Sequence, residues 1–362
     1  MKSEDRLYRE LQRHLDKETI GFPETPSGSD IELLKQLFTP EEAAVTALLT
    51  FRYEPLEQIQ ERGEKSGRSR EDTERLLDQV AAKGIIGYRK KDGVKQYRTI
   101  PYLVGMAEGA LLHPSPGLAA AHMNYLKDGA FLGKFVSTKI PQMRTIPVGK
   151  SITPVHNIGN YDEIRQLILA SPGPIVIFDC VCRKNAALAG NPCKNTSRKE
   201  TCMALGDIAE VVIESGRLGR QISREEALET LQQNQDDALV LQPSNSQEPG
   251  FICSCCGCCC GLLQLHKALP NPLSHWATNF FAQVNAELCT ACGVCEERCQ
   301  AGALKMTEGD TCPAVDLTHC LGCGLCVVAC PTEAITLKQK ATETVPPRTG
   351  EEMMEYIMAN RQ

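Results

Sequence analysis

Two stretches near the C-terminal end decide how this part of the chain folds: "CTACGVCEERC" at residues 289–299 and "CLGCGLCVVACP" at residues 320–331. Each places four cysteines in the order CxxCxxCxxxC, so the chain contains an internal repeat. Three thiolates at this spacing on a tight loop can bind three corners of one iron cube, while the fourth cysteine points to another cube. The repeat therefore predicts two iron–sulfur sites that exchange one ligand each.

The repeat closely resembles the bacterial two-cluster ferredoxins, which implies a ferredoxin-like domain with two [4Fe-4S] clusters. The resemblance implies that one cluster is held by Cys289, Cys292, Cys295 and Cys330, and the second by Cys320, Cys323, Cys326 and Cys299. The family's proline after the fourth cysteine is present as Pro331 but is replaced by Gln300 in the first repeat. We expect this replacement to affect loop rigidity more than ligation.

Other residues of this region are not needed as ligands, because each cube already has four thiolates. Cys312 fits neither repeat and is expected to be a plain buried thiol, and His319 is expected to be a packing residue. Two zinc sites are the alternative to the cubes. They are disfavoured because zinc ribbons use paired CxxC knuckles with longer separations.

The other cysteines are concentrated in the middle of the chain. Of 19 in total, none precedes Cys180, and six fall within eight consecutive positions of "FICSCCGCCCGLLQLHK" at residues 251–267. The ferredoxin repeat is satisfied by its own thiols, so the central cysteines require a metal of their own. The candidate ligands, of which a subset is expected to bind, are Cys180, Cys182, Cys193, Cys202, Cys253, Cys255, Cys256, Cys258, Cys259 and Cys260.

Two strand-like stretches, "PIVIFDC" (174–180) and "DALVLQ" (237–242), could bring these cysteines together, with a capped helix between them at "ISREEALETLQQ" (222–233). "GLLQLHKAL" (261–269) also reads as a helix, whose N-terminal dipole would favour thiolate at residues 258–260. Arg183 and His156 could serve a pocket, although such residues are more often found in packing or at the surface.

Six cysteines in so short a stretch cannot all bind one cube, because side chains of adjacent residues diverge. We expect either one more cubane that uses three or four of the ten, or an unusual cluster that uses more. Zinc and a redox-active dithiol are the alternatives. The layout resembles the cysteine-dense domain found beside ferredoxin repeats in uncharacterised iron–sulfur proteins of anaerobic bacteria, a resemblance that implies no particular activity.

The N-terminal third combines predicted helices with a hairpin. Thr39 and Ser69 read as helix caps, Gly84 as a helix end, and Asp92-Gly93 as the turn of a hairpin in "GIIGYRKKDGVKQYRTI" (84–100). This order resembles a winged helix-turn-helix. Residues 61–98 hold 11 Lys and Arg against 7 Asp and Glu, a modest excess that permits DNA contact, but a docking or structural role is favoured.

The predicted fold class is α+β with several domains. They are a winged-helix-like domain (1–105), a linker and connecting segment (106–160), a mixed α/β cysteine-rich domain (161–283), the two-cluster ferredoxin domain (284–340) and a C-terminal tail or helix (341–362). The net charge of −6 argues against general affinity for nucleic acid. The charged N-terminus lacks a signal peptide and no long apolar run occurs, so we expect a cytoplasmic chain without a membrane span.

These observations predict an electron-transfer protein that passes low-potential electrons between the ferredoxin module and a central cysteine-rich cluster, with a redox partner protein. One alternative is an iron–sulfur redox sensor in which the winged helix binds DNA. Another is a reductase, an oxidoreductase component that acts on a small substrate at the central cluster. No GxGxxG fingerprint opens a βαβ unit, so a nicotinamide or flavin is not indicated.

Overall fold

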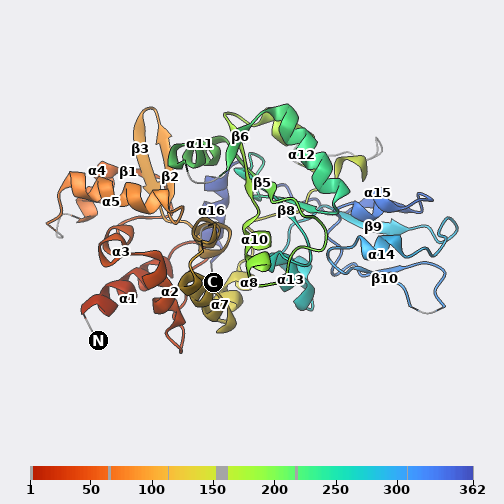
Figure 1. Ribbon diagram of the computed structural model, residues 1–362, viewed down its shortest axis with the longest axis horizontal. Coiled ribbons are helices and arrows are strands. Elements are labelled where there is room, and N and C mark those ends of the chain that lie inside the picture. Colours follow the sequence, from red (N-terminus) through yellow and green to blue (C-terminus); the bar gives the residue numbers. More distant parts are fainter. Residues whose placement is uncertain are drawn as a thin grey trace. The chain divides into compact units, whose positions relative to one another are not determined.

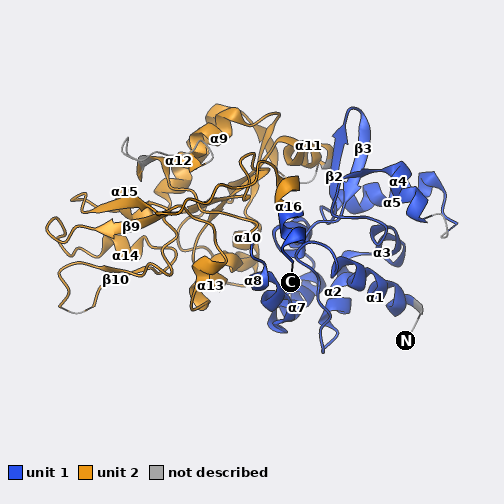
Figure 2. Cartoon of the chain, turned by 180° about the vertical axis from the view of Figure 1, so that it is seen from behind, with its two compact units in different colours: residues 1–140, 354–362 blue, residues 141–353 orange. Residues whose placement is uncertain are grey.

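The computed structural model describes residues 3–63, 67–112, 114–151, 162–216, 219–307 and 309–361, so His156 lies outside the described residues. The chain divides into two compact units, residues 1–140 with 354–362 and residues 141–353 (Figure 2). Helices and strands occur in both, so the predicted α+β class with more than one domain is confirmed. Among the described residues, every helix is too short or too polar to cross a membrane.

The first unit begins with three helices and continues with a small antiparallel sheet of order β1-β3-β2. Its elements up to residue 98 are α1 (Ser3–Leu15), α2 (Ser29–Leu37), α3 (Pro40–Thr46), β1 (Glu54–Pro55), α4 (Leu56–Gly63), α5 (Arg70–Ala82), β2 (Gly87–Lys91) and β3 (Val94–Arg98). In Figure 1, β2 and β3 form a ribbon beside α5. The order α3-β1-α4-α5-β2-β3 therefore places two helices directly before a hairpin.

The predicted helix boundaries in this unit are confirmed. Thr39 and Glu42 form a reciprocal capping box at the start of α3, and the Ser69 side chain accepts a hydrogen bond from the Asp72 amide at the start of α5. The hairpin turn is confirmed as well, because Asp92 and Gly93 have φ angles of 51° and 80°. Two positive φ angles define the tight turn that suits the twist of a hairpin.

A linker is predicted over residues 106–160, but the structure has helices in part of this segment. They are α6 (Ala107–Leu111), α7 (Pro116–Lys127) and α8 (Ala130–Ser137). Tyr125 and Phe131 are fully buried, and the ring of Tyr125 stacks on that of Phe22 at 4.6 Å between centroids. These helices therefore belong to the aromatic core of the first unit.

The second unit is built on a five-stranded antiparallel sheet of order β6-β4-β5-β8-β7. Its strands are β4 (Ile175–Asp179), β5 (Glu200–Leu205), β6 (Arg220–Ile222), β7 (Val240–Pro243) and β8 (Phe251–Cys255). The two strands predicted from the sequence correspond to β4 and β7, which are not neighbours. Between them lie β5 and β8, which carry cysteines themselves.

The helices of this unit before the C-terminal repeats are α9 (Ile164–Ala170), α10 (Val181–Leu188), α11 (Gly206–Ser215), α12 (Arg224–Asp236) and α13 (Gly261–Ala268), and α16 (Gly350–Ala359) begins near its end. Both predicted helices are confirmed as α12 and α13. Ser223 caps α12 by accepting a hydrogen bond from the Glu226 amide, and Cys260 occupies the N-cap position of α13. Two of the helices, α10 and α13, begin at a cysteine, since Cys180 is the N-cap of α10.

The C-terminal cysteine repeats lie between two paired strands, β9 (Phe280–Val284) and β12 (Ile335–Gln339). Between them come α14 (Val294–Glu297), β10 (Leu304–Lys305), β11 (Ala314–Val315) and α15 (Leu325–Ala329). The predicted boundary at residue 283 falls within β9. One hydrophobic core runs from the central sheet, with Ile177 and Leu241, to the region of the C-terminal cysteine repeats, with Leu321 and Ile335.

Candidate metal centres

The first predicted cluster site is a cavity. Cys289, Cys292, Cys295 and Cys330 all line one cavity, together with Pro331 and Ile335. Three of these cysteines come from the loop and first turn around α14, and Cys330 comes from the end of α15. The cavity thus brings together residues from both repeats, and its donor set of four thiols suits an iron–sulfur cube.

The other four repeat cysteines also lie close together. Cys320 and Cys326 are buried. Cys323 and Cys326 both interact electrostatically with Cys299 and Cys320. Burial raises the pKa of Cys323 to about 12, and the neighbouring thiolates add to that rise. Such a group stays protonated unless a cation compensates its charge, which is the chemistry expected of cluster ligands.

Backbone amides point at several of these sulfurs. Ala303 donates to Cys299 Sγ at 3.2 Å and Ala334 donates to Cys330 Sγ at 3.3 Å. In both cases the donor follows the fourth cysteine of its repeat by four residues, so the internal repeat extends to the backbone. Amide donors of this kind stabilise negative charge on a cluster ligand.

Four of the ten central cysteines form a compact group, which we call the four-thiol group: Cys193, Cys256, Cys258 and Cys259. Their four Sγ atoms all lie within 4.8 Å of one another. Cys193 Sγ is 3.5 Å from Cys256 Sγ and 3.8 Å from Cys258 Sγ, and Cys256 Sγ and Cys258 Sγ are 3.5 Å apart. Cys258 Sγ and Cys259 Sγ are 3.6 Å apart.

These separations fit a single tetrahedral ion. A metal–sulfur bond of about 2.3 Å places the corners of a tetrahedron about 3.8 Å apart, close to the observed values. A cube holds its four thiolates on four different irons and therefore keeps them farther from one another. The geometry of this group thus differs from the additional cubane expected from the sequence.

Two thiols of this group, Cys193 and Cys256, differ in how readily they ionise as free groups. Burial disfavours the Cys193 thiolate, but the amides of Thr196 and Asn195 outweigh this effect and lower its pKa to about 7. Burial and the nearby Cys193 charge raise the pKa of Cys256 to about 12. A bound cation is therefore needed for all four to be thiolates together near neutral pH.

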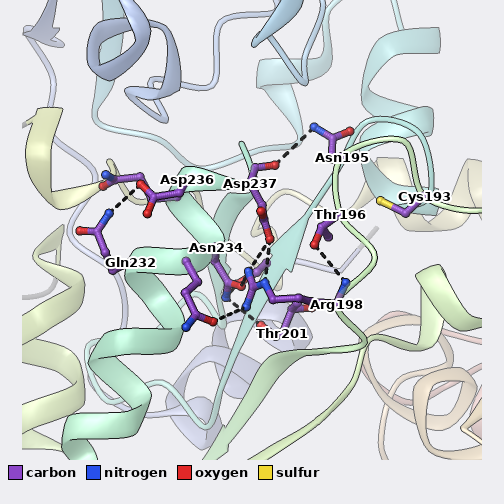
Figure 3. A network of polar contacts seen from close by, with 12 residues as sticks. Cys193, Asn195, Thr196, Arg198, Thr201, Gln232, Asn234, Asp236 and Asp237 are labelled. Atoms are coloured by element: carbon purple, nitrogen blue, oxygen red, sulfur yellow. Dashed lines mark hydrogen bonds and ion pairs between the residues drawn. The ribbon is translucent and has the colours of Figure 1, made fainter.

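The loop that carries Cys193 is fixed by a polar network (Figure 3). Arg198 donates to Asp237 Oδ2 at 2.8 Å and to Asn234 Oδ1 at 2.7 Å. Asn234, which is fully buried, donates in turn to the Thr201 carbonyl. These contacts tie the loop to the C-terminal end of α12 and hold Cys193 opposite the turn that carries the other three thiols.

The remaining six central cysteines lie apart from this group. Cys180 and Cys182 are at the start of α10, Cys202 is on β5, Cys253 and Cys255 are on β8, and Cys260 caps α13. Arg183 is buried and donates to Thr201 Oγ1 at 2.7 Å. Its guanidinium also interacts with Cys180, Cys193 and Cys256.

Gln300 of the C-terminal repeat region contacts the turn that carries three thiols of the four-thiol group. Gln300 Oε1 accepts a hydrogen bond from the Gly257 amide at 2.8 Å, and Lys267 Nζ donates to the Gly257 carbonyl at 2.7 Å. Arg298 donates to the Gln235 and Asp236 carbonyls at the end of α12. The sequence alone did not identify Gln300 as a contact residue. The only signal was that a glutamine replaces the proline present in the second repeat.

A comparison with protein families finds two matches to the 4Fe-4S binding domain, at residues 282–305 and 313–336. Each match contains the four cysteines of one repeat. A search of curated proteins finds no match to the chain. The C-terminal region therefore carries two 4Fe-4S binding motifs, and the middle of the chain carries a four-cysteine group able to hold a metal.

Proposed function

We propose that this chain is an iron–sulfur electron-transfer protein in which the C-terminal motifs exchange single electrons with a metal centre at the four-thiol group. Clusters of the ferredoxin kind supply one-electron transfer at a low potential, about −400 mV. The proposed ligand sets remain those implied by the ferredoxin resemblance. The cavity lined by Cys289, Cys292, Cys295 and Cys330 supports the first of them.

The hydrogen bond between Gln300 and Gly257 is the observation that carries this proposal. Gln300 follows Cys299, a proposed cluster ligand, while Gly257 lies between Cys256 and Cys258 of the four-thiol group. A few covalent bonds and this one hydrogen bond therefore connect Cys299, a proposed cluster ligand, with Cys256 and Cys258 of the four-thiol group. Gly257 also permits the approach, because a Cβ atom there would lie 2.4 Å from the Gln300 carbonyl oxygen.

Positive side chains surround this connection. Lys267 donates to the Gly257 carbonyl, and Arg298 binds the carbonyls at the end of α12. Positive charge near a tetrathiolate centre favours its reduced form, because reduction adds negative charge. The connection between the centres is thus both close and electrostatically suited to accept an electron.

For the N-terminal unit we propose a winged-helix-like domain that docks a protein partner. Its α5 would be the DNA-contacting helix of a sensor, yet it contains four acidic residues and two arginines. Lys95 of the hairpin forms ion pairs with Glu74 and Asp78 of α5, at 3.0 and 2.7 Å. An acidic helix repels phosphates, so docking is favoured over DNA binding.

The proposed electron route is tested with the variant Gln300→Pro. Proline restores the residue found in the second repeat but removes the side-chain acceptor, so the clusters should assemble while electron exchange with the four-thiol centre slows. The matched control is Pro331→Gln, which alters the equivalent position of the other repeat. The readout is the rate at which the four-thiol centre is reduced after rapid anaerobic reduction of the clusters. Equal rates in wild type and Gln300→Pro would remove Gln300 from the route.

A further inference from the structure

The proposed ligands of the first cluster reach the protein surface. Cys292 is exposed, Cys289 and Cys330 are partly exposed, and Cys295 is buried. The two residues that precede Cys292 are exposed as well, and they line the same cavity. A cluster held by these four thiols would therefore lie next to solvent.

The proposed ligands of the second cluster are more covered. Cys320 and Cys326 are both buried, whereas Cys323 and Cys299 are partly exposed. Leu321 and Leu325, within the same repeat, each expose only 1% of their surface. The Ala282 amide of β9 donates to Cys320 Sγ at 3.3 Å, so a strand outside the repeat also contacts this ligand.

A segment from before the central sheet adds to this cover. The Val148 amide donates to the Cys323 carbonyl at 2.9 Å, and the Ser151 side chain fills the space that a Cβ atom at Gly324 would need. The same segment is bridged to β7 through Ile146. The loop of the second repeat is therefore packed against the central part of this unit.

The two proposed clusters also differ in their connection to the four-thiol group. Cys299, a proposed ligand of the second cluster, directly precedes Gln300, which accepts the hydrogen bond from Gly257. The second cluster thus has the connection to the central cysteines, while the first cluster has the exposed ligand. This arrangement suits a relay in which the first cluster meets external redox partners.

The exposed surface around the first cluster is acidic. Residues 285–297 and 330–334, which supply the four cysteines of the cavity, contain four glutamates and no Lys, Arg or His. All four are exposed: Glu287, Glu296, Glu297 and Glu333. Leu288 lies among them and exposes 51% of its surface. An apolar contact with a charged surround is the usual composition of a protein interface.

We propose that electrons enter and leave the protein at the first cluster, and that a redox protein with an electropositive face docks there over residues 285–297. In each encounter one electron passes between the partner's redox centre and the first cluster, so one centre is oxidised as the other is reduced. The acidic surface steers such a partner towards Cys292. This inference rests on the proposed electron-transfer function and adds where the partner binds and what its charge is.

A basic c-type cytochrome serves as the probe, because its positive surface and high-potential haem make it an acceptor of electrons from low-potential clusters. The rate of haem reduction by the anaerobic, cluster-reduced protein is followed by stopped flow. Glu287→Lys combined with Glu297→Lys should slow the bimolecular step about tenfold or more at low ionic strength. The difference should shrink as salt is added.

The matched control combines Glu210→Lys with Glu214→Lys, which reverses two exposed charges on α11 and changes the net charge by the same amount. This control should retain nearly the wild-type rate. Equal slowing in both double variants would show an effect of net charge alone and would overturn the docking site. An unchanged rate in the Glu287 and Glu297 variant would overturn it as well.

Cys299→Ser tests which cluster meets the partner. This variant should lose the second cluster and keep the first, so its remaining cluster should still reduce the cytochrome at the wild-type bimolecular rate. A large loss of rate would identify the second cluster as the exchange point and overturn the proposal. If the variant does not fold, the charge-reversal pairs decide. Neither measurement involves the four-thiol centre, so failure of the internal route through Gln300 would be recognised separately.

Discussion

Gln300 and Gly257 are joined by a hydrogen bond of 2.8 Å although 43 residues separate them in the sequence. The glutamine stands where the second repeat has Pro331, so one of the two repeats is adapted to contact the central cysteines. The glycine provides an amide between two thiols of the four-thiol group. This pair therefore links the two cysteine-rich regions through atoms adjacent to the proposed ligands of each.

Gly257→Ala should destabilise the second unit. The new Cβ would lie 2.4 Å from the Gln300 carbonyl oxygen, and this overlap with the backbone should cost about 1–3 kcal/mol of unfolding free energy. The matched control is Gly261→Ala at the start of α13, where no atom lies within 4 Å of the new Cβ. Chemical denaturation of the anaerobic holoproteins measures the difference. Equal stability of the two variants would contradict the close approach.

Lys267→Met should lower the reduction potential of the four-thiol centre. The Lys267 ammonium donates to the Gly257 carbonyl, and its removal withdraws a positive charge that favours the added electron. Because Lys267 is exposed, the change should be about 1 kcal/mol or less, which for one electron corresponds to about 40 mV or less. Lys338→Met, an exposed position on β12, is the control in the same redox titration. A higher reduction potential in Lys267→Met than in the wild type would contradict the proposed effect of the Lys267 charge.

The exposed lysines of the hairpin should not support specific DNA binding. Lys90 and Lys91 are exposed, while Arg89 lies over the Tyr53 ring at 4.2 Å and is thereby engaged within the unit. Replacing Arg89, Lys90 and Lys91 by Ala should leave electron transfer intact, and a duplex-selection experiment should recover no preferred site from the wild type. A specific site whose affinity falls in the variant, with a shallower salt dependence, would favour the sensor alternative.

Replacing Cys299, a proposed cluster ligand, should change the iron content, whereas replacing Cys312 should not. Cys299→Ser should damage the cluster held mainly by the second repeat and lower the iron content by up to about four atoms. Cys312→Ser should leave the iron content unchanged, since Cys312 belongs to neither proposed ligand set. Iron and sulfide analysis with electron paramagnetic resonance distinguishes the two. Iron loss in Cys312→Ser would show that the proposed ligand sets are wrong.

The sequence predicted most of the local structure that depends on short-range rules. The caps at Thr39, Ser69 and Ser223 and the Asp92-Gly93 turn all follow from side chains or φ preferences that act within a few residues. The C-terminal repeat could also be recognised from the sequence, because its cysteine spacing is set by the geometry of the metal centre that the ligands share.

The division of the ten central cysteines could not be predicted, because it depends on long-range strand pairing. The stretches "ETCMAL" and "FICSC" do not alternate between apolar and polar residues, so β5 and β8 gave no clear strand signal. Only their pairing shows that Cys202 and Cys253 are neighbours, and only the fold of the loop at residues 189–199 brings Cys193 to Cys256. The contact made by Gln300 is of the same long-range kind.

Mössbauer spectroscopy of the ⁵⁷Fe-labelled, full-length protein during stepwise anaerobic reduction tests electron exchange between the centres most directly. We predict one iron with the spectrum of a mononuclear tetrathiolate site, in addition to the iron of the [4Fe-4S] clusters. This iron should change from ferric to ferrous when the clusters alone are supplied with electrons. A four-thiol group that holds zinc, or an iron there that stays ferric while the clusters are reduced, would contradict the proposed electron transfer.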